Sequence, residues 1–259
     1  MSDPDPQAMA ESQLAELVAR ATYEPEDGTP DRPGRAKALA AMVPVLGRSA
    51  KVAGIRAVAA GRWLSDEIVE LAPKVPIRDA ATLRKQYPGL SDAQIAERLI
   101  KNAKKTTISL GAAAGGLAAI EFASPPLLLM SPIQLSAEIL AVSAVELKMV
   151  AELHEILGRP APGTPTERAS AYLMSWVRRR AISPQAGGAG LAAVFGTAAK
   201  RELRSQVIRR LGRSTLKMAP FMAGAVAGAE VNRRATKDLG ETLFAELHPM
   251  TEPRWFRRV

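Results

Sequence analysis

The sequence predicts an all-α protein, and three features support this fold class. No stretch shows the sustained alternation of apolar and polar residues that is typical of β-strands. Capping residues precede several apolar segments of helical periodicity, and glycine or proline follows them. Two segments rich in glycine and alanine carry a G-x-x-x-G spacing, at Gly111 and Gly115 and again at Gly224 and Gly228. We expect a single multi-helix domain with these two segments at its centre.

The first glycine- and alanine-rich segment, residues 106–131, is the longest nearly uncharged part of the chain, and Glu121 is its only ionisable residue. Glycines four residues apart lie on one face of a helix, where a second helix backbone can approach closely. We therefore predict that the two segments pack on each other. The uncharged run before Glu121 is shorter than the roughly 20 residues of a membrane-spanning helix. A tightly packed soluble core and a membrane-contacting hairpin that turns at Pro125 and Pro126 both agree with this pattern.

The composition is that of a globular protein with a sizeable core. The chain has 259 residues, 47% of them hydrophobic and 24% charged, enough for one large helical domain or two small ones. Cysteine is absent, which excludes disulfides, cysteine-ligated zinc and thiol catalysis. The two histidines, His154 and His248, are not spaced as metal ligands on one helix, and no phosphate-binding loop or nucleophile motif is present. We therefore predict no catalytic residue, cofactor or metal site.

The net charge of +9 is unevenly distributed along the chain. Residues 1–31 hold eight acidic residues and one basic residue, Arg20, a balance of −7, so that the rest of the chain carries +16. We expect residues 1–34 to form an acidic, disordered arm with a short helix over residues 12–21, although the arm could also fold back on the basic body. This N-terminus lacks the apolar stretch of a secretory signal, so we expect a cytoplasmic protein.

The positive charge is concentrated between residues 178 and 217, where ten basic residues accompany only Glu202. Such a stretch predicts an anionic partner: lipid headgroups, nucleic acid or an acidic protein. Nucleic-acid binding would favour aromatic residues among the charges, and this stretch holds only Phe195. We therefore favour an anionic membrane surface, although a solvated face agrees with the pattern about as well. The residues predicted to contact the membrane are Arg178, Arg179, Arg180, Arg201, Arg209, Arg210, Arg213 and Lys217.

Helix signals follow one another along the first half of the chain. Residues 35–69 are alanine-rich and helical in pattern, with interruptions at Pro44, Gly47 and Gly61. A short helix is predicted over residues 79–86, because it begins with an aspartate, a common N-cap, and ends before a Pro-Gly pair.

Capping patterns delimit the later helices. Residues 91–94 form a capping box at the start of a lysine-rich helix that continues into the first glycine- and alanine-rich segment. A long helix over residues 132–157 follows a Ser-Pro start and ends at a glycine. Residues 164–167 combine an N-cap, a proline at N1 and an acid at N3, and they begin a helix that ends near Arg180. A basic helix, a last long helix with the second glycine pair, and a basic tail at residues 248–259 complete the chain.

The helix predicted over residues 132–157 is apolar on most of its circumference. Five polar side chains share one sector at 100° per residue: Gln134, Glu138, Lys148, Glu152 and Glu155. Glu146 lies instead in the apolar sector, where a carboxylate must be paired or protonated. We expect an internal ion pair with an arginine, and a functional acid is the alternative. Glu121 and Asn232 are further candidates for buried polar residues.

The C-terminal glycine segment resembles the EcsC family in the pattern Pro220-x3-Gly224-Ala225-x2-Gly228-Ala229-x2-Asn232-x3-Thr236-x2-Leu239-Gly240. The lysine-rich helix that enters a Gly/Ala segment, and the long helix that ends at Gly158, are similar to the family as well. The resemblance covers about residues 50–247, within a helical domain that we place at residues 35–247. It implies an all-helical protein with no established catalytic residue, associated in some bacteria with an ABC transporter system. This chain departs from the family in its acidic arm and around residues 125–126.

These observations predict a non-catalytic helical protein that associates peripherally with anionic membrane surfaces, on the cytoplasmic side of the cell membrane. A membrane protein as a further partner, and an accessory role in a transport system, would agree with the resemblance. Two other classes stay open: an enzyme that uses the buried carboxylate of Glu146, and a nucleic-acid-associated helical protein. The sequence does not specify an oligomeric state.

Overall fold

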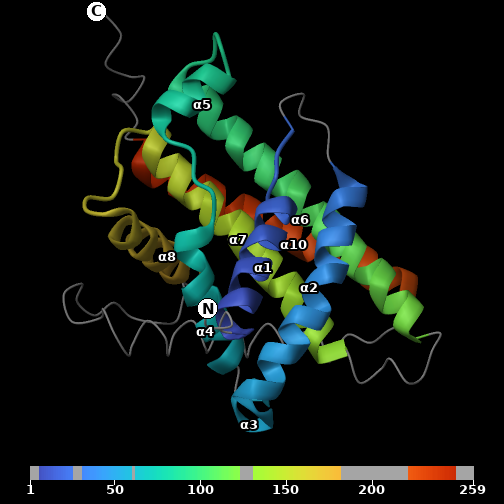
Figure 1. Ribbon diagram of the computed structural model, residues 1–259. Helices are drawn as coiled ribbons and strands as arrows, with labels where there is room; N and C mark the ends of the chain where they lie inside the picture. Colours follow the sequence, from blue (N-terminus) through green and yellow to red (C-terminus); the bar gives the residue numbers. More distant parts are fainter. Residues whose placement is uncertain (1–5, 26–30, 60–61, 123–130, 182–220, 249–259) are drawn as a thin grey trace, which may run out of the picture.

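The computed structural model describes residues 6–25, 31–59, 62–122, 131–181 and 221–248 of the chain. Within these ranges all regular secondary structure is helical, as the sequence predicts, and the helices form one packed bundle (Figure 1). The elements are α1 (Pro6–Ala21), α2 (Arg32–Ala53), α3 (Ile55–Ala59), α4 (Arg62–Leu71), the 3-10 helix η1 (Ala72–Lys74), α5 (Ala80–Gln86), α6 (Asp92–Phe122), α7 (Ser131–Ile156), α8 (Pro165–Ala181) and α10 (Phe221–Leu247).

Helix α7 is the centre of the bundle (Figure 1). It contacts α1, α2, α4, α5, α6, α8 and α10, and every residue from 139 to 153 is buried. Because most of its side chains are aliphatic, neighbouring helices can cover it on all sides. The polar sector that the sequence predicts on this helix is covered as well, and its charges meet partners on other elements.

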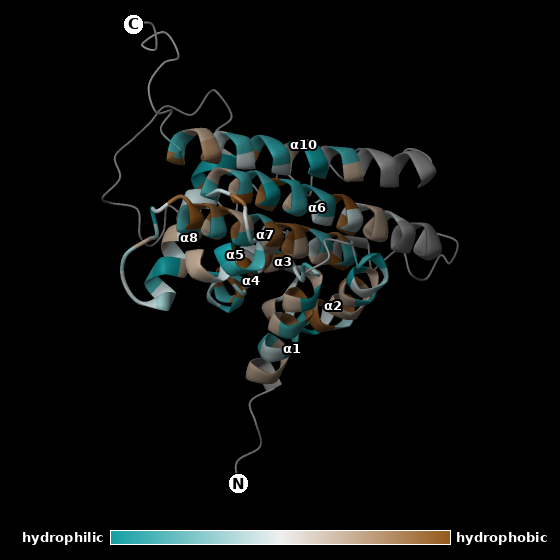
Figure 2. Cartoon of the chain, turned by 90° about the horizontal axis from the view of Figure 1, so that it is seen from above, coloured by the Kyte–Doolittle hydropathy of each residue, from teal (hydrophilic) through white to brown (hydrophobic). Residues whose placement is uncertain are grey.

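Helices α6 and α10 run antiparallel along each other, beside α7 (Figure 2). A Cβ atom built at Gly111 of α6 would lie 3.1 Å from the Cα of Ala229, and one built at Gly240 of α10 would lie 2.9 Å from the Cγ1 of Ile100. Positions 111 and 100 of α6 therefore face positions 229 and 240 of α10 in reverse order. The helices that carry the two glycine- and alanine-rich segments thus lie directly against each other.

Capping residues fix the ends of several helices where the sequence predicts them. At the start of α6 the backbone N–H of Gln94 donates to Ser91 Oγ at 3.3 Å, and Gln94 Oε1 accepts from the backbone N–H of Ser91 at 2.9 Å. Thr164 and Glu167 form the same reciprocal pair at the start of α8. After α7, Gly158 has a φ of +72°, a left-handed conformation that glycine adopts without strain.

Residues 6–21 of the N-terminal arm form helix α1, so the arm holds a longer helix than the short one predicted over residues 12–21. Helix α1 begins at Pro6, six residues before the predicted start at Ser12, and packs on α2. Its fully buried residues are Leu14, Val18 and Ala21. The prediction gave most weight to the acidic residues, whereas these three apolar positions form one helical face that the core can bury.

Helix α2 continues past two residues that were expected to interrupt it. Pro44 and Gly47 both lie inside the helix, which ends before Gly54, where φ is +83°. A glycine inside a helix costs about 1 kcal/mol and a proline about 3 kcal/mol. The buried residues of this helix, Arg35, Ala38, Leu39, Met42, Val45, Leu46 and Ala50, offset that cost through tertiary packing. Gly61 lies outside the described residues.

Candidate functional site

Glu146 lies in the middle of α7 with 0% of its surface exposed, and α8 and α10 supply its partners. Arg180 donates from Nε to Glu146 Oε2 at 2.9 Å, and its Nη2 contacts Oε1. Trp176 Nε1 donates to Oε2 at 3.0 Å, and the hydroxyl of Thr236 donates to Oε1 at 2.8 Å. The arginine partner expected for Glu146 is therefore Arg180. Both carboxylate oxygens have donors, and the cluster ties α7, α8 and α10 together.

A second cluster joins α7 to the segment between η1 and α5. Arg78 donates to Glu152 at two points, from Nε to Oε1 at 2.7 Å and from Nη2 to Oε2 at 2.6 Å. Lys148 Nζ donates to the same carboxylate at 2.5 Å and to the carbonyl oxygen of Pro76 at 2.7 Å. Burial lowers the pKa of Arg78, but the hydrogen bonds and the charge of Glu152 outweigh it and raise that pKa above its ordinary value. Arg78 therefore stays charged while it is buried.

The segment that follows α1 closes over this second cluster. Glu24 Oε2 accepts from Arg78 Nη2 at 2.8 Å. Burial raises the pKa of Glu24 above its ordinary value, and the charge of Arg78 opposes that rise. Arg35 of α2 is only 2% exposed and donates from Nη2 to the carbonyl oxygen of Tyr23 at 2.9 Å. Two arginines on other elements therefore hold the chain segment that links α1 to α2.

Arg35 is an unusual buried cation within the described part of the chain. Its Nε and Nη1 have no hydrogen-bond partner there. Burial lowers its pKa, and the charges of Glu24 and Asp31 raise it in part. These two carboxylates supply a negative potential around the guanidinium. They balance the charge of Arg35 from a longer distance than that of a direct ion pair.

The third cluster lies at the C-terminal end of α7. The hydroxyl of Tyr172 donates to Glu155 Oε1 at 2.5 Å and accepts from the backbone N–H of Ala161 at 3.0 Å. Arg168 pairs with the same carboxylate. Burial raises the pKa of Tyr172, and its hydrogen bond to Glu155 raises it further. Tyr172 therefore remains a neutral hydrogen-bond donor, and it joins α8 to α7 and to the loop between them.

His154 is half-buried next to this cluster. Its Nδ1 lies 3.2 Å from the carbonyl oxygen of Arg159, and its Nε2 lies 3.2 Å from Ser175 Oγ. Burial lowers the pKa of His154, so the neutral imidazole is favoured near pH 7. Among the described residues, no group of three or more His, Cys, Asp or Glu side chains is arranged to hold a metal ion.

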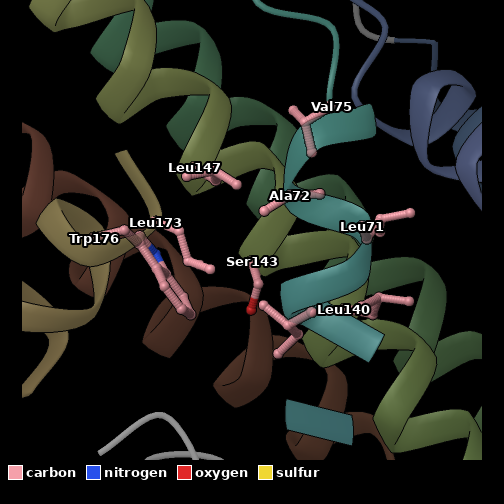
Figure 3. A pocket seen from close by; sticks show the side chains of 10 residues that line it. Leu71, Ala72, Val75, Leu140, Ser143, Leu147, Leu173 and Trp176 are labelled. Atoms are coloured by element: carbon pink, nitrogen blue, oxygen red, sulfur yellow. The ribbon is translucent and has the colours of Figure 1, made fainter. Parts of the chain in front are cut away.

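A small cavity lies between α4, η1, α7 and α8 (Figure 3). Its volume is about 10 Å³, and its lining side chains include Leu71, Leu140 and Trp176. Ser143 points into it with a hydroxyl that has no hydrogen-bond partner in the described structure. A volume of this size holds at most about one water molecule, which needs two or more polar partners. The cavity is therefore a packing defect and does not fit an organic substrate.

The four predicted packing glycines lie on α6 and α10. Gly111 faces the backbone of Ala229 and also the side chain of Asn232, whose Nδ2 would lie 3.1 Å from an added Cβ. Asn232 is buried, as predicted for this candidate, and donates to Glu138 Oε1 at 2.8 Å. Gly115 is half-buried on α6. For Gly224 and Gly228 only the helical backbone of α10 belongs to the described structure.

The arginines at the end of α8 do not share one surface, which corrects part of the predicted anion-contact set. Arg178 is exposed. Arg179 donates to Ser175 Oγ at 2.5 Å and pairs with Glu246 of α10, and Arg180 pairs with Glu146. Consecutive residues of a helix point in directions 100° apart, so three in a row must diverge. The other predicted contacts lie outside the described residues: Arg201, Arg209, Arg210, Arg213 and Lys217.

Two structural residues were missed by sequence reasoning. Arg78 lies in an irregular segment, where no helical periodicity identifies a buried side chain. The only sign of a buried cation in the sequence was that a buried carboxylate such as Glu152 needs one. Gly240 closes the contact of α10 with α6 and α7, because a Cβ there would meet Ile100 and Met149. Gly240 is part of the pattern that resembles the EcsC family, but it does not belong to a G-x-x-x-G pair, so the spacing did not mark it as a packing residue.

Glu121, the third candidate for a buried polar residue, lies in the last turn of α6, and its side chain is outside the described structure. Of the helices that the structure describes, none combines the length and the apolar character that crossing a membrane requires.

Comparison with known proteins identifies no relative. No protein-family model, no curated protein and no solved structure matches the chain. The resemblance to the EcsC family therefore rests on the residue pattern of the sequence alone.

Proposed function

We propose that this chain is a non-catalytic helical protein of the EcsC type that associates peripherally with anionic membranes on their cytoplasmic side. The observation that carries the proposal is that the C-terminal end of α6 and the N-terminal ends of α7 and α10, each with few charges, meet at one end of the bundle. An accessory role in a membrane transport system agrees with the resemblance to the EcsC family. The helix ends and the chain segments attached to them are the contact region in this proposal.

Three helix ends meet there because of the helix directions. Helix α10 runs antiparallel to α6, so Phe221 of α10 lies at the end where α6 reaches Phe122. Helix α7 packs along α6 and begins at Ser131, with only eight residues between the two helices. Figure 2 shows α6, α7 and α10 side by side in this arrangement.

The sequence attached to these ends has the character that a membrane contact needs. Residues 123–130 read ASPPLLLM and contain no charge. Lys217 stands four residues before Phe221, the first residue of α10. Apolar chain and basic chain are therefore attached to the same end of the bundle, the combination by which peripheral proteins bind anionic lipid.

The geometry of Glu146 favours this proposal over an enzyme that uses a buried carboxylate. Both carboxylate oxygens accept hydrogen bonds from side chains, and none of the residue's surface is exposed. A general acid or base needs to come within hydrogen-bond reach of its substrate. The bonds to Arg180, Trp176 and Thr236 instead give Glu146 the role of holding three helices together.

Sedimentation of the full chain with lipid vesicles tests the proposal. We expect binding to vesicles that contain anionic phospholipid, little binding to neutral vesicles, and a decline as salt shortens the screening length below about 8 Å. Leu128→Glu should weaken binding, because it places a charge in the uncharged stretch between α6 and α7. Leu90→Glu is the matched control, since Leu90 is exposed just before α6 begins, at the opposite end of that helix.

Equal binding to anionic and neutral vesicles would contradict the electrostatic part of the proposal. Equal loss of binding in Leu128→Glu and Leu90→Glu would contradict the assignment of membrane contact to the end of the bundle where α6 ends and α7 begins. Binding to DNA without binding to vesicles would favour the nucleic-acid alternative.

A further inference from the structure

The outer face of α6 carries a dense group of basic side chains. At 100° per residue Arg98, Lys101, Lys104 and Lys105 fall within a sector of about 120°. Lys101 and Lys105 are exposed, and Arg98 and Lys104 are half-buried. The only acidic residue in this sector is Glu97. We call these four residues the basic face of α6.

The basic face is not neutralised by the described part of the protein. None of its four residues forms an ion pair within the part of the chain that the structure describes. On the neighbouring helix α10, Glu230 pairs with both Arg233 and Arg234, and Lys237 pairs with Glu241. The contrast is local, because α6 and α10 lie side by side. An unneutralised positive face of this kind matches an anionic partner.

Beyond the basic face the same side of α6 loses its charge. Ile108, Ala112 and Gly115 fall in the same angular sector, and Ala112 is exposed while the other two are half-buried. At a rise of 1.5 Å per residue, Gly115 lies about 15 Å from Lys105 along the helix axis. One face of one helix therefore changes from basic to apolar along its axis.

We propose that the basic face of α6 binds the phosphate groups of an anionic lipid surface, with the apolar continuation of that face directed into the membrane. This inference rests on the proposed peripheral membrane association and names the residues that make its polar contact. Long lysine side chains suit this place, because their aliphatic stems lie along apolar surface while their ammonium groups reach the headgroups. The face also assigns lipid contact to residues without an ion pair in the described structure, in place of Arg179 and Arg180, which are half-buried and paired with glutamates.

The test compares two double variants that remove the same charge. Lys101→Gln with Lys105→Gln removes the two exposed lysines of the basic face. Lys37→Gln with Lys51→Gln removes two exposed lysines of α2, which lie 14 residues apart and form no cluster. A basic residue at an anionic surface strengthens binding about fivefold. We therefore expect the first variant to bind anionic vesicles about 25-fold more weakly than the wild-type chain, and the second to change binding much less.

Each outcome decides between the face and the proposed function. If wild-type protein binds anionic vesicles and both double variants lose affinity equally, the basic face is not the lipid contact, and the proposed membrane association stands. If wild-type protein binds no vesicles, both the lipid contact at the basic face and the proposed function are wrong. If the double variant Lys101→Arg with Lys105→Arg still binds anionic vesicles, the result supports the basic face, because the positive charge is kept. If the double variant Lys101→Gln with Lys105→Gln loses binding to DNA but keeps binding to vesicles, the result overturns lipid binding by this face in favour of a nucleic acid. Because all four lysines are exposed, unchanged thermal melts are expected and exclude misfolding as the cause.

Discussion

A side chain at Gly111 of α6 would press tightly against the backbone of Ala229 in α10. An added Cβ would lie 3.1 Å from the Cα and 3.2 Å from the backbone nitrogen of Ala229. Backbone atoms of a packed helix cannot move aside as the end of a flexible side chain can. The two helices therefore approach this closely because residue 111 has no side chain.

Gly111→Ala should destabilise the protein, although alanine is favoured over glycine in a helix by about 1 kcal/mol. Gly111→Leu should cost more, at least the 1–3 kcal/mol that is typical of overpacking. Urea unfolding of both variants measures these effects. The matched control is Gly47→Ala in α2, where an added Cβ meets nothing within 4 Å, so this variant should gain up to about 1 kcal/mol. A stabilised Gly111→Ala would contradict the close contact.

The fold class and the close packing of α6 on α10 could be predicted, but the register of that contact could not. A G-x-x-x-G spacing marks a helix face that lacks side chains, and it does not say which residue of another helix will lie there. In the structure Gly111 faces an alanine, and the second tight contact is made by Gly240, a glycine outside both pairs. Such pairings depend on how all the helices fit together, which a local pattern in one sequence does not encode.

Glu146 and Arg180 should show strong coupling in a double-mutant cycle. Glu146→Leu leaves the arginine without its buried partner, and Arg180→Leu leaves an unpaired carboxylate in the core. Breaking a buried ion pair from one side typically costs about 3–5 kcal/mol. The double variant should lose less than the sum of the single variants, because it leaves no charge unpaired. Additive losses in urea unfolding would show that the pair does not act as a unit.

The identity of the partner of Glu146 illustrates a limit of sequence reasoning. A carboxylate in the apolar sector of a helix must be paired, so an arginine was expected. Three consecutive arginines end α8, and the sequence alone assigned all of them to the surface. In the structure Arg180 pairs with the buried Glu146, whereas Arg179 is half-buried and pairs with a glutamate at the surface, and Arg178 is exposed. Which member of a run is buried depends on helix rotation, and helix rotation is set by packing.

Helix α1 should contribute to stability, because it belongs to the core. Leu14 is 3% exposed, and Leu14→Ala should cost about 2–5 kcal/mol, the range for a buried leucine. Met9 lies on the same helix with 48% of its surface exposed, so Met9→Ala should change the free energy of unfolding by much less. Thermal and urea unfolding of both variants check this. If both variants unfold like the wild-type chain, α1 is a detachable arm, as its acidic composition first indicated.

The buried carboxylate of Glu24 should make stability depend on pH. The charged and titratable groups that face it are Arg78, Glu152, Lys148, Arg35 and Tyr87. Burial raises its pKa above the ordinary 4.5, and Arg78 only partly opposes this. A carboxyl group with a raised pKa binds its proton more tightly in the folded state. Its contribution to stability is therefore full below pH 4.5 and is lost as the pH rises through the folded pKa.

Glu24→Gln should remove this pH dependence, because glutamine keeps an oxygen for the hydrogen bond from Arg78 and has no proton to lose. We expect the variant to be more stable than the wild-type chain at pH 7.5, and the difference to shrink as the pH approaches 4. Urea unfolding across this range measures it. Glu16→Gln is the control, since Glu16 forms an exposed pair with Arg20 in α1, and such pairs contribute about 0–1 kcal/mol. A Glu24→Gln variant that is less stable than the wild-type chain at pH 7.5 would show that the attraction of Arg78 exceeds the cost of burying the carboxylate.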